Sequence, residues 1–240
     1  IVGIEELGLG FKAITAKKVS FTVRSSPIAG EISNLELQPS YSDLLSGKLS
    51  FAIAGEIFSS QLALIASTSL FGDSTSLSGS LKGLKVGSVP QLALAELESG
   101  EISIDNLKFF KSDQNIEFSG IASISNLVKP RDTTITLKNT LIFIPSFDVS
   151  KATLPFNSDS SHIRLNQGEI VSSYGNLNGD LTLDRGNNDR VLCETQFTPS
   201  TVFEGRFASL LPLMLQGDTK KRPLNISCAG DIKRITLISK

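Results

Sequence analysis

Apolar and polar residues alternate along most of this 240-residue chain, and glycine repeatedly opens the alternating runs. The clearest runs begin at Gly30, Gly47, Gly100 and Gly179, each followed by one polar residue and then by an apolar one. A period of two places one side of a strand against apolar neighbours and the other side toward solvent. Glycine before such a run is typical of a chain that turns into a strand. The pattern therefore predicts a series of similar strands.

Short spacing between these runs, with little helix between them, indicates antiparallel neighbours joined by hairpins. We expect a mainly β fold: an elongated, twisted and curved antiparallel sheet, half-barrel or groove-like, with about three short helices. The first residues, with Glu5 and Glu6, are expected to form a coil. The expected strands cover residues 14–23, 28–37, 48–58, 61–70, 76–86, 101–110, 115–127, 133–144, 147–154, 168–173, 177–183, 190–197, 224–228 and 232–238.

Helix punctuation, with proline or serine at a start and glycine past an end, occurs in three places. The first predicted helix follows Ser40 and stops at Gly47, and the second runs from Pro90 to Gly100. The third follows Ser200, and Pro212 should kink or end it. The third helix carries an apolar stripe at helical spacing, which predicts core packing rather than a ligand site: Phe203, Phe207, Leu210, Leu211 and Met214.

Composition limits the classes of function. The net charge is −1, and the longest basic run is residues 220–222, so a nucleic-acid interface is not expected. The longest apolar runs are far too short to span a bilayer as a helix. The chain contains no motif for a nucleotide, metal or other cofactor, and we expect none to be bound. Its length permits one large β-domain or two small ones, and we predict a single domain over residues 1–240.

Cys193 and Cys228 are the only cysteines, and His162 is the only histidine. This set is too small for a metal cage. Both cysteines lie in predicted strands near the C-terminus, so those strands could be neighbours. One disulfide is possible in an oxidising compartment, and two buried free thiols are the alternative.

Three tetrapeptides, residues 71–74, 159–162 and 186–189, resemble conserved sequence blocks of the GDSL/SGNH hydrolases. In that reading Ser74 would attack, His162 would take its proton, Asp159 would orient the histidine and Asn188 would help bind the oxyanion. The blocks occur in a different order from that family, however, and the chain shows no alternation of parallel strands and helices. All three lie in predicted turns, where such tetrapeptides arise freely. We therefore expect a protein that is not an enzyme.

The strongest apolar alternation predicts one apolar sheet face as the functional surface. A sheet that curves without closing leaves part of such a face uncovered, and large exposed apolar patches usually mark a partner or lipid site. The short helices could instead cover the face and make it ordinary core. The residues of this predicted face are Leu49, Phe51, Ile53, Leu62, Leu64, Ile102 and Ile104.

Several short glycine-based segments resemble the GspN-like family, the type II secretion system protein N of Gram-negative bacteria. They are residues 34–39, 44–47, 89–92, 98–102, 210–217, 222–224 and 228–232. The resemblance implies a periplasmic, non-enzymatic accessory or scaffold component, with other envelope secretion-system proteins as partners. It also implies anchoring to the inner membrane through an N-terminal helix that this sequence, beginning at Ile1, lacks.

The same strand pattern is similar to the long β-groove proteins of the AsmA type. That resemblance implies an alternative function, a periplasmic lipid-binding or lipid-transfer module that holds lipid on the apolar face. An open apolar groove favours the lipid function, whereas a closed core favours the scaffold.

Overall fold

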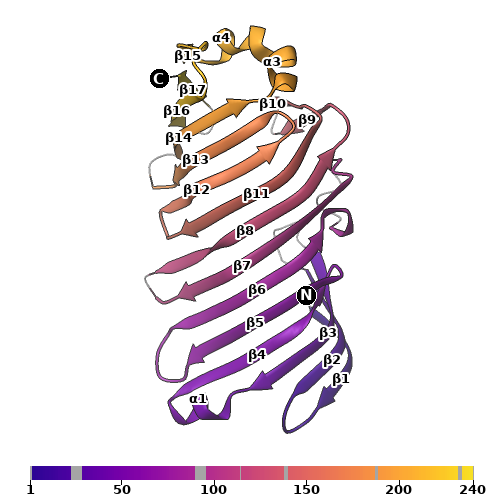
Figure 1. Ribbon diagram of the computed structural model, residues 1–240. Helices are drawn as coiled ribbons and strands as arrows, with labels where there is room; N and C mark the ends of the chain where they lie inside the picture. The colour runs from indigo at the N-terminus through magenta and orange to yellow at the C-terminus, as the bar shows by residue number, and fades with distance from the viewer. Residues whose placement is uncertain are drawn as a thin grey trace. The chain divides into compact units, whose positions relative to one another are not determined.

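The computed structural model describes residues 2–22, 29–89, 96–113, 115–137, 140–186, 189–231 and 234–239. Figure 1 shows long neighbouring strands joined by short connections and a few short helices. The prediction of a mainly β, antiparallel fold is confirmed. The chain divides into two compact units. Unit one is Ile1–Ala95 with Glu101–Gly120, and unit two is Glu96–Gly100 with Ile121–Lys240. The single domain stays a prediction.

Unit one is an open antiparallel sheet in which the strands pair in chain order. Its edge strand β1 lies where the sequence predicted a coil. The seven strands are β1 (Val2–Leu9), β2 (Ile14–Thr22), β3 (Ala29–Pro39), β4 (Lys48–Ile57), β5 (Ser60–Ser69), β6 (Thr75–Lys85) and β7 (Ser99–Lys111). The first two residues of β7 fall in unit two, and the first five of β8 (Ile116–Lys129) fall in unit one.

Unit two pairs its main strands in the order β8, β11, β12, β13, β14, β16, β17, β15, antiparallel except for the parallel pair of β15 and β17. They are β11 (Phe147–Ser158), β12 (His162–Ser172), β13 (Gly175–Asp184), β14 (Arg190–Pro199), β15 (Gln216–Gly217), β16 (Leu224–Asp231) and β17 (Arg234–Ser239). The predicted single strand 133–144 is wrong, because this segment is a separate hairpin of β9 (Thr133–Leu137) and β10 (Thr140–Ile144).

Two of the three predicted helices occur where the punctuation placed them. Helix α1 (Tyr41–Leu45) follows Ser40, although the Ser40 side chain makes no capping hydrogen bond. Helix α3 (Thr201–Phe207) is capped by the Ser200 hydroxyl, which accepts from the Phe203 amide. The 3₁₀ turn η2 (Ala208–Leu210) and α4 (Leu211–Met214) follow, with Pro212 in the first turn of α4. The other 3₁₀ turn is η1 (Val86–Ser88). Residues 90–95 of the second predicted helix lie outside the described residues, and Glu96–Glu98 are not helical.

The sheets have little apolar core for a chain of this size. Eight apolar side chains of the described residues are buried, and three of them, Leu211, Leu215 and Leu224, form one cluster in unit two. The accessible surface is 15176 Å². A compact globular protein of 25.7 kDa exposes about 10,400 Å², and two separate globular halves expose about 12,600 Å². The large excess indicates that, among the residues that the structure describes, parts of the sheet faces have no second layer packed on them.

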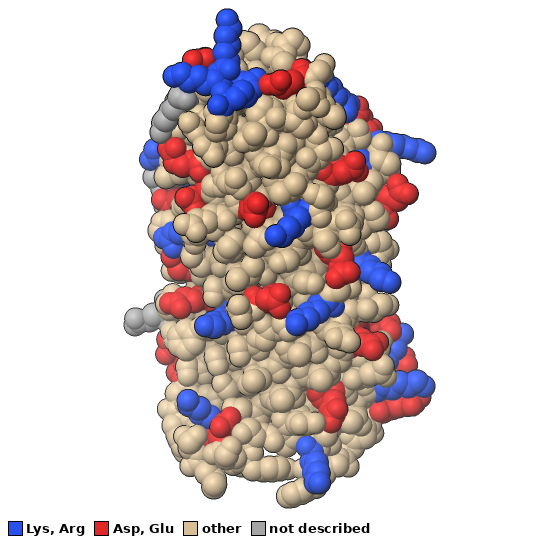
Figure 2. All heavy atoms as spheres, in the orientation of Figure 1, with Lys and Arg blue, Asp and Glu red and all other residues tan. Residues whose placement is uncertain are grey.

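Charged side chains are spread over the face shown in Figure 2, with basic and acidic residues interspersed among uncharged ones. Strand alternation explains part of this distribution. In β4, Lys48 and Glu56 are an odd number of positions away from Leu49, Phe51 and Ile53, so their side chains point to the opposite side of the sheet. None of the described helices is long and apolar enough to cross a membrane.

Candidate functional site: two apolar surfaces

The strand register in unit one places all seven residues of the predicted face on the same side of the sheet. Ile53 lies directly opposite Leu64 on β5, and Leu62 lies opposite Leu81 on β6. On β7, Ile104 lies opposite Leu81, and Ile102 lies opposite Leu84. Directly opposed residues of antiparallel strands share a face. We call this surface, with Leu81 and Leu84 included, the apolar face.

The apolar face has apolar surroundings within unit one. On strands β3 to β7, the positions directly opposite its residues are held by other members of the face or by small and apolar residues, with one Thr: Leu37, Pro39, Gly55, Ala66, Thr68 and Gly79. Each of the seven predicted residues is partly exposed, and none is buried. The side chains shield one another but are not sealed, so the face is neither closed core nor fully solvated. Its role as a binding surface stays a prediction.

A second apolar surface lies in unit two, beneath the segment that contains α3 and α4. It is a pocket of about 600 Å³ whose walls are almost entirely apolar. We call it the C-terminal pocket. The sheet side is formed by Ile170, Leu177, Phe197, Ile226 and Leu237, and the helical side by Phe203, Phe207, Leu210, Leu211 and Leu215. Ligand sites are typically apolar cavities of this size with few polar groups.

The pocket partly corrects the core prediction for the helical stripe. Leu211 is buried in the core cluster and Phe203 packs against that cluster, as predicted, and both residues also line the pocket together with Phe207 and Leu210. The side chain of Met214 lies outside the described residues. Sequence reasoning missed the pocket because core packing and pocket lining produce the same helical spacing. A signal was present in the aromatic residues of neighbouring elements: the ring of Phe203 packs edge-on against Phe197 and Tyr174.

Polar contacts hold the helical segment over the pocket. Arg206 on α3 forms an ion pair with Asp132, Nη2 to Oδ2 at 2.6 Å, and its Nη1 donates to the Tyr174 hydroxyl at 2.9 Å. Hydrogen bonds, first from the Ser146 amide and then from Arg206, lower the pKa of Asp132. Arg222 Nε donates to Glu204 Oε1 at 2.8 Å, which ties the same helix to the loop before β16.

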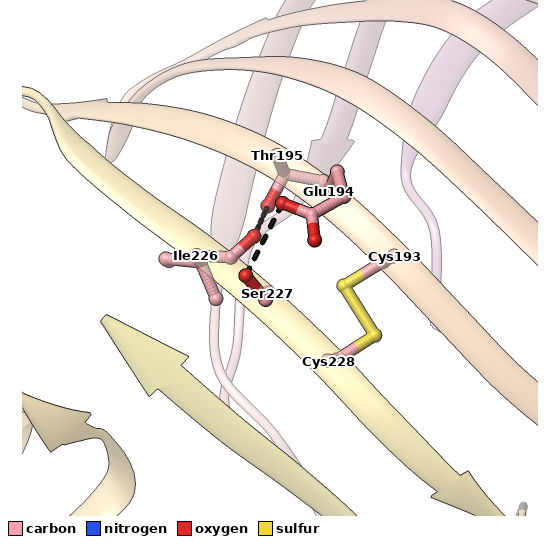
Figure 3. The surroundings of a disulfide bond; sticks show 6 residues. All are labelled: Cys193, Glu194, Thr195, Ile226, Ser227 and Cys228. Atoms are coloured by element: carbon pink, nitrogen blue, oxygen red, sulfur yellow. Dashed lines mark hydrogen bonds between the residues drawn. A yellow bond between two sulfur atoms is a disulfide. The ribbon is translucent and has the colours of Figure 1, made fainter. Parts of the chain in front are cut away.

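The cysteines form a disulfide between β14 and β16, with their Cα atoms 4.8 Å apart (Figure 3). Cys193 and Cys228 are directly opposite one another in the register, as this Cα distance requires. Leu181 on β13 and Leu237 on β17 are their other neighbours, so the sulfurs lie on the apolar side of the sheet. On the opposite side, Ser227 donates to the Glu194 carboxylate at 3.2 Å.

The residues of the hydrolase alternative are distributed over both units. Ser74 lies in unit one, in the turn after β5, whereas Asp159 and His162 lie in unit two. Asn188 is outside the described residues. In unit two the structure adds a contact that sequence reasoning missed: the Ser161 hydroxyl lies 2.8 Å from His162 Nδ1 and 2.9 Å from Asp159 Oδ1.

This local Ser, His and Asp cluster has the geometry of a satisfied turn. Asp159 Oδ1 accepts from the amides of Ser161 and His162 at 2.8 and 2.7 Å, and its Oδ2 accepts from Arg164 Nη1 at 3.0 Å. These bonds, led by the Ser161 amide, hold the pKa of Asp159 well below its usual range. Both amides next to the hydroxyl are therefore engaged and do not form an oxyanion hole. The arrangement stabilises the entry to β12.

No family model, curated protein or solved structure matches this chain. The resemblance to the GspN-like family therefore rests on short segments of the sequence alone.

Proposed function

We propose that this protein binds the hydrocarbon chains of lipids on its apolar surfaces, without a catalytic step. The observation that carries the proposal is the apolar face of unit one, whose side chains are partly exposed and opposed by apolar neighbours. The peptide groups of a paired strand are already hydrogen-bonded, so such a face offers an occupant dispersion contacts and removal of apolar surface from water. The hydrocarbon part of an acyl chain has no polar groups, so these two contributions are sufficient for it to bind.

The C-terminal pocket supports the same proposal from unit two. Its aromatic and aliphatic walls match a hydrocarbon chain or another compact apolar group, and Ser172 and Tyr174 are its polar residues. The disulfide supports a location in an oxidising compartment, because such bonds persist outside the cytosol. The periplasmic, membrane-anchored location implied by the resemblance is part of the proposal.

The test compares two adjacent substitutions on β4 that place the same charge on opposite sides of the sheet. Ile53→Glu puts a carboxylate on the apolar face, and Ala54→Glu puts one on the other side. The probe is a fluorescent fatty acid titrated into delipidated protein. We expect Ile53→Glu to weaken binding at least tenfold, because it places a charge against hydrocarbon. Ala54→Glu should bind as the wild type does.

Far-UV circular dichroism of each variant controls for folding. If Ile53→Glu does not fold, Leu64→Ser on the facing strand provides a milder change at the opposed position. A folded Ile53→Glu variant with unchanged affinity would show that the apolar face does not bind acyl chains.

A scaffold role in type II secretion is the second proposal. The observation that favours it is edge strand β1, which pairs with β2 on one side and ends the sheet of unit one on the other. An unpaired edge can accept a strand from a partner protein. Proline lacks the amide donor, so it blocks such pairing where the replaced amide faces away from β2; because amide directions alternate along a strand, Ile4→Pro and Glu5→Pro are compared. Secretion in cells is the readout, and normal secretion by both folded variants would reject this role.

A further inference from the structure

Exposed apolar side chains gather at one end of the strands of unit one. The connections β1–β2, β3–β4 and β5–β6 all lie at this end, because antiparallel neighbours reverse direction at each turn. Leu45, Phe71 and Phe11, one from each connection, are 93%, 91% and 84% exposed. Tyr41, Leu44 and Leu70 are also exposed. We call these six residues the strand-tip cluster.

Direct contacts join the three connections. The rings of Phe11 and Tyr41 stack with their centroids 5.4 Å apart, and the Tyr41 hydroxyl donates to the Phe11 carbonyl. The Leu70 amide donates to the Gly47 carbonyl at 2.9 Å. The Phe71 ring lies beside Gly47, where an added Cβ would come within 3.0 Å of it. The cluster is therefore one assembled surface.

We propose that the strand-tip cluster inserts into the surface of a lipid bilayer. Single large apolar side chains that project almost fully from separate turns fit a deformable hydrocarbon phase better than the close-packed surface of a protein. Aromatic residues with leucine are typical of segments that lie at the membrane interface.

The backbone of the turns is compatible with that environment. Peptide groups that enter an apolar phase must already be hydrogen-bonded. The turns meet this condition at several positions: the Gly10 amide donates to Ala13, the Ser46 amide to Asp43, and the Ser69 amide to Ser74, at 3.0 Å in each case.

Charge near the cluster is balanced. Lys12 and Lys48 lie at these turns together with Asp43 and Asp73. Insertion should therefore depend on the apolar side chains and not on anionic lipid headgroups, so uncharged phosphatidylcholine should suffice.

The location of the cluster also identifies a source for the lipid, a step that rests on the proposed function. The apolar side of the sheet reaches this same end, where Leu9 lies opposite Ile14 and Pro39 lies opposite Phe51. A hydrocarbon chain that leaves the bilayer between the inserted tips would meet the apolar face directly.

The chain contains no tryptophan, so one introduced residue reports on its own surroundings. Leu45→Trp places the probe in the cluster, and Leu213→Trp places it on α4 in unit two, at a site that is 83% exposed. With vesicles of phosphatidylcholine, we expect a blue shift of emission and quenching by brominated lipid for Leu45→Trp only. The shift should persist in 0.5 M salt, roughly the range in which ion pairing is screened.

Loss of binding is tested with Leu45→Ser combined with Phe71→Ser in the full chain. We expect at least a tenfold loss of vesicle co-sedimentation, with unchanged binding of a soluble fluorescent fatty acid. Equal emission shifts at positions 45 and 213, or no shift at 45, would overturn the proposal. So would a photo-crosslinker at position 45 that captures protein instead of lipid in cells. If vesicles bind through the cluster but Ile53→Glu leaves fatty-acid binding unchanged, docking stands and the proposed function fails.

Discussion

Asp159 shows how a single side chain organises the turn before β12. Its carboxylate accepts from two successive amides, the Ser161 hydroxyl and Arg164. All of these partners favour the ionised form, so the pKa of Asp159 is lowered, with the Ser161 amide as the main cause. The folded state therefore binds the proton on Asp159 more weakly than the unfolded chain does.

This difference predicts a pH dependence of stability. The ordinary aspartate pKa is about 3.9, so the contribution of Asp159 is fully present above that pH and is lost as the pH falls toward the lowered folded value. Asp159→Asn should reduce the urea midpoint at pH 7, and its difference from the wild type should shrink below about pH 4. A difference that grows on acidification would contradict the assignment.

The pair Cys193 and Cys228 should contribute strongly to the stability of unit two. The bond closes a loop with a sequence separation of 35, for which loop entropy corresponds to about 3–4 kcal/mol. The double variant Cys193→Ala, Cys228→Ala should lose this amount in urea unfolding and become insensitive to reductant. Two free thiols in the unreduced, denatured wild type would disprove the bond.

At the scale of elements, the period-two pattern predicted most strands, and its interruptions mark bulges. The apolar phase changes between Ile32 and Leu35, and the residue between them with positive φ is Asn34. The apolar positions also shift by one residue at Asn106 in β7 and at Gln167 in β12, and both of these residues have a positive φ. A residue in the left-handed region adds one position to a strand and restores the apolar side.

A change in the apolar phase also explains why the first residues were predicted as a coil although they form strand β1. Val2 and Ile4 precede Glu6, which has a φ of 51°, and Leu7 and Leu9 follow it in the opposite phase. Without knowledge of the shift, this run has no steady period. The hairpin of β9 and β10 was missed for another reason. Both segments consist of Thr, Leu, Ile and Phe, none of which is disfavoured in strands, and no glycine or proline separates them in the sequence.

Two glycines of unit two should respond oppositely to the same substitution. Gly179 in β13 has a φ of 150°, and a Cβ there would lie 2.6 Å from the Thr195 Cα of the neighbouring strand and would clash with the Glu194 carbonyl oxygen. Gly179→Ala should cost about 1–3 kcal/mol. Gly205 in α3 has no atom within 4 Å of its Cβ position, so Gly205→Ala should stabilise by about 0.5–1 kcal/mol. Urea unfolding measures both, and equal effects would exclude the strand clash.

At the scale of the whole molecule, the property most relevant to function is how much of the apolar surface of the sheets stays exposed to solvent. The sequence predicted which residues share the apolar face, because alternation and hairpin pairing are local rules. It could not predict whether another layer covers that face, since coverage depends on contacts between elements distant in sequence. The C-terminal pocket has the same origin: Phe203 and Phe197 meet only after α3 folds back on β14.

Binding to the uncovered face should be visible in global stability. A ligand that binds only the folded state at 100 times its Kd adds about 2.7 kcal/mol. For a chain of this length, that corresponds to a rise of several degrees in Tm. We expect palmitate to raise the Tm of the wild type and of Ala54→Glu, and to raise that of Ile53→Glu less. Scanning calorimetry measures the shifts, and equal shifts in all three proteins would place the ligand elsewhere.

The disulfide has a topological consequence for the C-terminal pocket. Helices α3 and α4 lie between Cys193 and Cys228 in sequence, so the segment over the pocket is an arc of a covalent ring whose ends are fixed on adjacent strands. Opening of this arc requires loss of the Arg206 contacts with Asp132 and Tyr174 and of the packing of Leu211 and Leu215, and its return is a short search because both ends stay in place. Under the proposed function, a hydrocarbon chain would thus enter or leave the pocket of the oxidised protein without separation of β14 from β16.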